Sequence, residues 1–163
     1  MVFEPIFIPV GIAQKLLNTR SRRTIQDLLA RGIIPHLRTG SNRTRLLPRG
    51  YILGLAQYLN GRSATAPLVR EFNATKEARG LVGEAKTRLL AAINLRRKHT
   101  SDEAAEILGV ERNTVNNWIL DEVLHAEVEP RKGMVISSAN PLSQKYAITA
   151  EALHNFVGWV TPI

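Results

Sequence analysis

Arginine is the residue type whose number and spacing most suggest chemistry in this sequence. Seven arginines lie within residues 18–45, NTRSRRTIQDLLARGIIPHLRTGSNRTR. A guanidinium group is always charged and presents its N–H donors in a planar fork, which suits phosphates and the edge of guanine. The cluster therefore favours contact with a polyanion. The alternative is an exposed surface that only keeps the protein soluble.

The distribution of charge along the chain favours the same interpretation. Of the net charge of +8, residues 1–62 contribute ten Lys/Arg against two Asp/Glu. Residues 63–99 contain eight against three, and residues 100–163 contain four against nine. A basic N-terminal part beside an acidic C-terminal part indicates that a polyanionic partner would bind the former.

Other patterns that could support chemistry are missing from the sequence. The four histidines are scattered, without the HExxH spacing of a metal-binding helix, and no glycine-rich phosphate loop or Ser/His/Asp arrangement is found. We therefore expect no enzymatic activity, no metal site and no cofactor. The histidines are His36, His99, His125 and His154.

The composition also indicates a compartment. The chain has no cysteine, and no apolar run approaches the length of a membrane span. The first residues, MVFEPIFIPVGIAQKLL, are apolar but lack the basic region and cleavage site of a signal peptide. We expect a cytoplasmic, nucleoid-associated protein that does not contact a membrane.

The arginines of residues 18–45 must be positioned by helices and a hairpin. Residues 10–17 carry apolar side chains at helical spacing, and a second helix is expected from Ser21 or Thr24 to Gly32. An extended run follows, with a hairpin turn at residues 39–42. Pro48 then fits the first turn of a third helix.

Residues 100–160 repeat this order. AAEILG parallels AQKLLN, NTVNNWILDEVLH parallels RTIQDLLARGIIP, and KYAITAEALHNFV parallels TRLLPRGYILGLAQYL. Thr100 and Glu103 form a potential capping box, and Trp118 takes the core position of Leu28. The C-terminal residues 157–163 are apolar, and the sequence leaves open whether they pack on residues 63–99 or on a second chain.

The segment between the repeats has the pattern of a helical linker. We expect one or two helices in residues 63–99, broken or weakened near Gly80 and Gly83. The basic run at residues 96–99 is explained by a helix C-terminus, where cations are favourable. An apolar face toward the second repeat is expected from Leu89, Leu90, Ile93 and Leu95.

The second repeat carries a resemblance to a known family. TSDEAAEILGVERNTVNNWI followed by YAITAEALHNFV resembles the excisionase-type, MerR-like helix-turn-helix, with its LGV-x-R-x-TV turn and closing helix. IAQKLLNTRSRRTIQDLLARGIIPHLRTGSNRTRLLP in the first repeat is similar. The second repeat departs from the pattern at residues 120–123, LDEV, and in a long segment containing Pro130, Gly133 and Pro141.

The resemblance implies a winged-helix fold and DNA binding without catalysis. We therefore expect a mainly α structure with small β-hairpin wings (α+β), built from tandem winged helix-turn-helix units. The expected organisation is a basic first unit (residues 1–62), a helical linker (residues 63–99) and an acidic second unit (residues 100–163).

In such a fold the second helix enters the major groove and the wing meets the backbone. In the first unit these positions are Arg20, Ser21, Arg22, Arg23, Thr24, Gln26, Arg38, Ser41, Asn42, Arg43 and Arg45. In the second unit they are Arg112, Asn113, Asn116, Asn117, Arg131 and Lys132.

The sequence favours sequence-specific binding of double-stranded DNA, by a regulator or an excisionase-like accessory factor of a mobile element. The carboxylates around the second helix of the second unit leave an alternative open. In that alternative the protein is a DNA-tethered adaptor, whose second unit binds a second copy or another protein. A homo-oligomer or protein partner is expected, if present, at residues 63–163. RNA binding is disfavoured by the low aromatic content of 6%.

Overall fold

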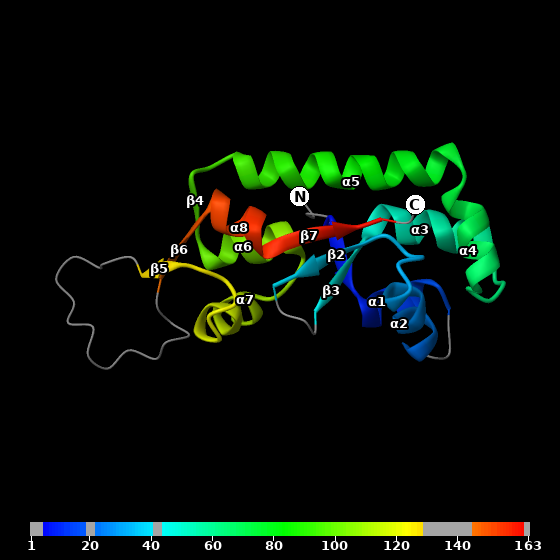
Figure 1. Ribbon diagram of the computed structural model, residues 1–163, viewed down its shortest axis with the longest axis horizontal. Coiled ribbons are helices and arrows are strands. Elements are labelled where there is room, and N and C mark those ends of the chain that lie inside the picture. Colours follow the sequence, from blue (N-terminus) through cyan, green and yellow to red (C-terminus); the bar gives the residue numbers. More distant parts are fainter. Residues whose placement is uncertain (1–4, 19–21, 41–43, 129–144, 162–163) are drawn as a thin grey trace.

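The computed structural model describes residues 5–18, 22–40, 44–128 and 145–161. The chain is mainly helical, with small antiparallel sheets between the helices (Figure 1). This confirms the expected α+β class. The assignment of the two units as winged helices stays a prediction.

From α1 to α3 the first unit has the order of helices and hairpin that its sequence predicts, but the strand before α1 was not expected. Gly32 ends the second helix with φ 69°, and Asn60 ends the third with φ 48°, both in the left-handed region. Pro48 lies one position earlier than expected, as the last residue of a strand and the N-cap of the third helix. The elements are β1 (Phe7–Pro9), α1 (Val10–Leu16), α2 (Arg22–Ala30), β2 (His36–Thr39), β3 (Arg45–Pro48) and α3 (Arg49–Leu59).

The linker contains two helices, but the break between them is not where the glycines stand. α4 (Ala66–Asn73) ends before α5 (Lys76–Asn94), which runs through Gly80 and Gly83. The Thr75 hydroxyl accepts a hydrogen bond from the Ala78 N–H at 3.1 Å and so starts α5. The predicted break near Gly80 and Gly83 was wrong, because the buried face along α5 outweighs the low helix propensity of two glycines. No helix in the described ranges is long and apolar enough to span a membrane.

The basic run lies only in part at a helix C-terminus, because Arg96 and Arg97 directly follow the C-cap of α5. Lys98–His99 form the short strand β4, which pairs with a strand of the second unit. The His99 ring is buried, with Nε2 2.8 Å from the Ile93 carbonyl oxygen near the end of α5. Of the four apolar residues expected to face the second unit, Leu89 and Ile93 are buried and Leu90 and Leu95 are exposed.

The second unit has the same order of helices and hairpin. The capping box between Thr100 and Glu103 is present, which confirms that prediction. Trp118 is buried, and its ring centroid lies 4.9 Å from that of Phe156. The elements are α6 (Ser101–Leu108), α7 (Arg112–Leu120), β5 (Glu127–Val128), β6 (Tyr146–Thr149) and α8 (Ala150–Phe156).

The C-terminal strand connects the two units. β7 (Val157–Val160) pairs antiparallel with β2, so the sheet has the order β1-β3-β2-β7. In this register Leu37 lies opposite Trp159 and Arg38 opposite Gly158. Residues 157–160 therefore belong to the sheet of the first unit, and they also lie next to α5 of the linker (Figure 1).

The four-stranded sheet has an apolar core on each face. On one face Ile8 and Leu47 pack with α1, α2, α3 and α4. On the other, Phe7, Leu37 and Leu46 pack with the second half of α5 and with the helices of the second unit. The first hairpin thus contributes to both cores, and separating the units would expose the second of these faces to water.

The turn between α6 and α7 is fitted closely to β1. Gly109 adopts φ 72°, and a Cβ there would overlap the carbonyl oxygen of Phe7. Because that contact is with backbone, relief would require the two units to move apart.

We expect Gly109→Ala to lower the free energy of unfolding by about 2–4 kcal/mol, from left-handed strain and overlap together. Gly61→Ala is the matched control, since Gly61 has φ 86° but no neighbouring atom within 4 Å of the place that an alanine methyl group would take. It should cost about 1 kcal/mol. Urea denaturation measures both, and equal losses would show that the turn does not need close contact with β1.

Candidate nucleic-acid interface

Helix α2 presents the residues that the sequence assigns to the major groove. Ile25, Leu28 and Leu29 are buried against the first core. Since these three positions fix the rotation of the helix, its opposite side is presented to solvent. The exposed residues of the first turn and a half are Arg22, Arg23, Thr24 and Gln26.

The hairpin brings a second set of arginines to the same place. Arg38 and Arg45 are directly opposite each other in the antiparallel pair β2–β3. A surface hollow of about 390 Å³ joins Arg45 to Arg22, Arg23 and Gln26 of α2. We call these residues, with Arg38, the arginine face. Asp27 also lines the hollow, and its carboxylate lies 3.7 Å from the guanidinium of Arg31.

Strand geometry explains why the hairpin arginines lie on this side. Leu37 and Leu46 point into the core shared with the second unit. Because side chains alternate across a strand, Arg38 and Arg45 take the other face, toward α2. The hairpin end is braced by the second unit, since a Cβ at Gly40 would come within 2.7 Å of the Phe156 ring.

A buried histidine lies under the arginine face. The His36 Nδ1 is 2.9 Å from the carbonyl oxygen of Ile34, to which it can donate. Burial lowers the pKa of His36, and the charges of Arg45 and Arg38 lower it further, against the opposing effect of the Ile34 hydrogen bond. The ring is therefore held neutral, and protonation would add a third cation beside the two arginines.

The lowered pKa of His36 gives a dependence of stability on pH. The unfolded chain takes up this proton near the ordinary pKa of 6.5 while the folded protein resists it, so stability is present above 6.5 and is lost as the pH falls below it. We expect His36→Gln to lose less stability than the wild type between pH 7.5 and pH 5, in urea denaturation series. Parallel curves for the two proteins would contradict a neutral buried His36.

The second unit presents a sparser set of polar residues. Arg112, Asn113 and Asn117 are exposed along α7, and the Arg112 Nε lies 3.6 Å from Asp102 Oδ1. Asn116 is fully buried, so its side chain cannot reach a base edge in this structure. Helical periodicity alone does not explain this, because Gln26, the matching residue of α2, is exposed.

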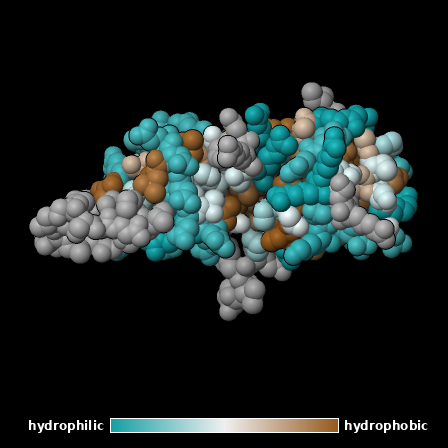
Figure 2. Space-filling model, turned by 90° about the horizontal axis from the view of Figure 1, so that it is seen from below, coloured by the Kyte–Doolittle hydropathy of each residue, from teal (hydrophilic) through white to brown (hydrophobic). Residues whose placement is uncertain are grey.

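The helices α2 and α7 lie on the same side of the molecule. Figure 1 shows both below the sheet, on the side away from α5. Viewed from that side, the surface is mainly hydrophilic, with smaller apolar areas between (Figure 2). The remaining predicted site residues lie outside the described residues. They are Arg20, Ser21, Ser41, Asn42, Arg43, Arg131 and Lys132.

Four cations that the sequence did not single out also gather in space. Arg31, Arg70, Arg79 and Lys86 line one cleft, although they belong to three different segments. The excess of positive charge in residues 63–99 could have indicated such a site. It could not show which of the eight Lys/Arg in that segment lie together in the fold. Among the described residues, no three His, Asp or Glu side chains are placed to hold a metal ion.

No known protein family, curated protein or solved structure matches this chain. The residues and their geometry are therefore the basis for assigning a function.

Proposed function

We propose that this protein binds double-stranded DNA through the arginine face. The observation that supports the proposal is the convergence of α2 and the β2–β3 hairpin on one hollow, lined by Arg22, Arg23, Gln26 and Arg45. A helix beside a hairpin can place side chains in a major groove and on the adjoining phosphates together. Gln26 can pair with adenine, and the arginines with guanine or phosphate.

The role we propose is that of a sequence-specific regulator or excisionase-like recombination factor of a mobile element. It rests on the resemblance of both units to the MerR-like helix-turn-helix. The β2–β7 pairing and the shared core support a rigid arrangement in which α2 and α7 keep a fixed separation. A fixed separation would favour DNA sites whose two halves have one spacing.

We expect Arg22→Ala/Arg23→Ala to weaken duplex binding at least about thirty-fold, equivalent to about 2 kcal/mol. The slope of log affinity against log salt should fall by about 2, since two phosphate contacts are lost. Fluorescence anisotropy with a selected duplex at several salt concentrations measures both. Lys76→Ala/Arg88→Ala is the matched control, because it removes two exposed charges from α5 on the opposite side.

The control variant should bind DNA like the wild type, within about twofold. If both double variants weaken binding equally, the attraction is a general effect of net charge and the arginine face is not the site.

A second candidate function is that of a DNA-tethered adaptor. The observation that favours it is the surface just after α7, where Leu120 and Val123 are 44% and 40% exposed beside Asp121 and Glu122. Carboxylates repel phosphate, while exposed apolar side chains surrounded by polar residues are found at protein contacts.

Asn113→Ala/Asn117→Ala distinguishes the two functions. Deleting the second unit would be unsuitable, because β7 and the second core stabilise the first hairpin. If α7 binds DNA, the variant should lose protection over one part of the footprint and weaken binding about tenfold or more. An unchanged footprint and affinity would support the adaptor, in which only the arginine face holds DNA.

A further inference from the structure

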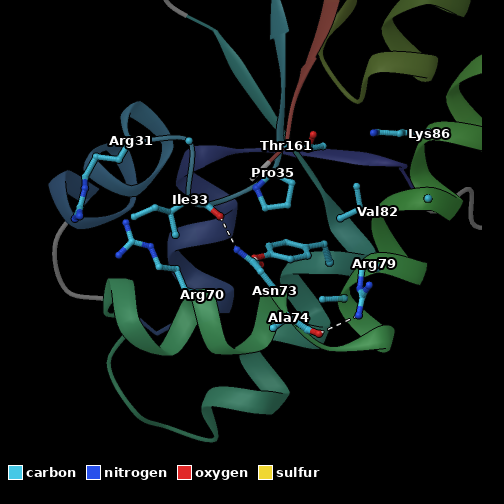
Figure 3. A pocket seen from close by; sticks show the side chains of 14 residues that line it. Arg31, Ile33, Pro35, Arg70, Asn73, Ala74, Arg79, Val82, Lys86 and Thr161 are labelled. Atoms are coloured by element: carbon cyan, nitrogen blue, oxygen red, sulfur yellow. Dashed lines mark hydrogen bonds between the residues drawn. The ribbon is translucent and has the colours of Figure 1, made fainter. Parts of the chain in front are cut away.

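A second cleft, larger than the hollow at the arginine face, begins at the C-terminal end of α2 and is lined by other residues. It has a volume of about 790 Å³ and is formed by the turn after α2, by α4, by the first half of α5 and by Thr161 (Figure 3). This volume is within the range of small-molecule sites. The DNA-binding proposal gives the cleft no role.

The charge of the cleft lining has a single sign. Arg31, Arg70, Arg79 and Lys86 line it, and no Asp or Glu of the described residues does. In Figure 3, Arg31 and Arg70 stand to one side of Asn73, and Arg79 and Lys86 to the other. A cleft with cations on both sides concentrates anions, and guanidinium groups match phosphate and carboxylate oxygens.

The cations are only partly neutralised within the protein. Arg31 has a distant carboxylate partner in Asp27, at 3.7 Å, and both side chains are about half exposed. Arg79 donates to the Ala74 carbonyl at 3.2 Å, and Lys86 Nζ lies 5.5 Å from the centre of the Trp159 ring. These contacts hold the two side chains at the cleft and leave further N–H donors for a ligand.

The floor of the cleft is fixed before any ligand binds. The Tyr51 hydroxyl donates to Asn73 Oδ1, and Asn73 Nδ2 donates to the Ile33 carbonyl at 2.7 Å. Burial raises the pKa of the Tyr51 hydroxyl far above its usual value, so it remains a donor. Pro35 and Val82 add apolar surface between the two pairs of cations. A preformed floor lowers the entropic cost of binding.

We propose that this cleft binds a small organic polyanion, with acidic groups on the two pairs of cations and its carbon part on the apolar floor. The shared chemistry is that of a phosphate-bearing or carboxylate-bearing metabolite with at least two negative charges. This site goes beyond the proposed function, because it uses other residues and requires no DNA.

Isothermal titration of the full chain without DNA tests the proposal, with ATP and citrate as the two probes at about 150 mM salt. We expect one-to-one binding of at least one probe with a submillimolar dissociation constant, and a matching rise in melting temperature. Tighter binding of ATP identifies phosphate as the preferred group, and tighter binding of citrate identifies carboxylate. Absence of binding by both overturns the proposal.

Two variants connect the binding to the cleft. Arg70→Ala/Arg79→Ala should weaken the bound probe at least about tenfold, since two charged donors are lost. Ala74→Glu keeps every cation but introduces a carboxylate at an exposed lining position, and should weaken binding to a similar degree. Ala91→Glu adds the same charge at an exposed position farther along α5, outside the lining, and should leave binding unchanged. Circular dichroism confirms folding of each.

The arginine face provides the remaining control. Arg22→Ala/Arg23→Ala should bind the probe like the wild type, even where it no longer binds DNA. If this variant loses the probe while the cleft variants keep it, the anion binds at the arginine face and the cleft proposal is overturned. If the wild type binds the probe but does not bind DNA, the DNA proposal is rejected and the cleft proposal stands.

Discussion

The pairing of β7 with β2 is the interaction on which the rest of the arrangement depends. It joins residues near the end of the chain to a hairpin about 120 positions earlier, in the register Leu37 to Trp159. Trp159 then packs on Phe7, with ring centroids 5.5 Å apart, so both ends of the described chain meet across the sheet. The entropy of closing so long a loop rises only slowly with its length, and the apolar area buried on the second face of the sheet opposes it.

This pairing also determines where the charges of the hairpin lie. Once Leu37 and Leu46 enter the core shared with the second unit, strand alternation places Arg38 and Arg45 toward α2. A shift of one residue in register would bury the arginines and expose the leucines. His36 shares the arginine side and stays neutral there, because burial and the two neighbouring cations both disfavour its protonated form. The arginine face is thus a consequence of how the second unit packs.

Local elements of this fold could be predicted from the sequence, because their signals are local. The apolar spacing of Ile25, Leu28 and Leu29 gave the rotation of α2, Gly32 gave its end, and Thr100 with Glu103 gave the start of α6. The same reasoning failed where a distant contact decided the outcome. α5 continues through its glycines because its other face is buried, and His99 lies in a strand because β6 pairs with it. Asn116 matches the exposed Gln26 of α2 in the sequence, yet it is buried, so the packing of the second unit and not the helix pattern decides its place.

The same distinction between local and distant contacts separates the two candidate sites. The arginine face draws mostly on one continuous segment, so a cluster of arginines in the sequence was sufficient to indicate it. The basic cleft combines a turn, two linker helices and the residue after β7, and Arg31 is 55 positions from Lys86. No spacing rule connects such residues before the sheet and α5 are assembled. Val69, Phe72 and Ala78 of α4 and α5 pack in the same core as α1, α2 and α3, and this packing brings the cations of residues 66–94 beside Arg31.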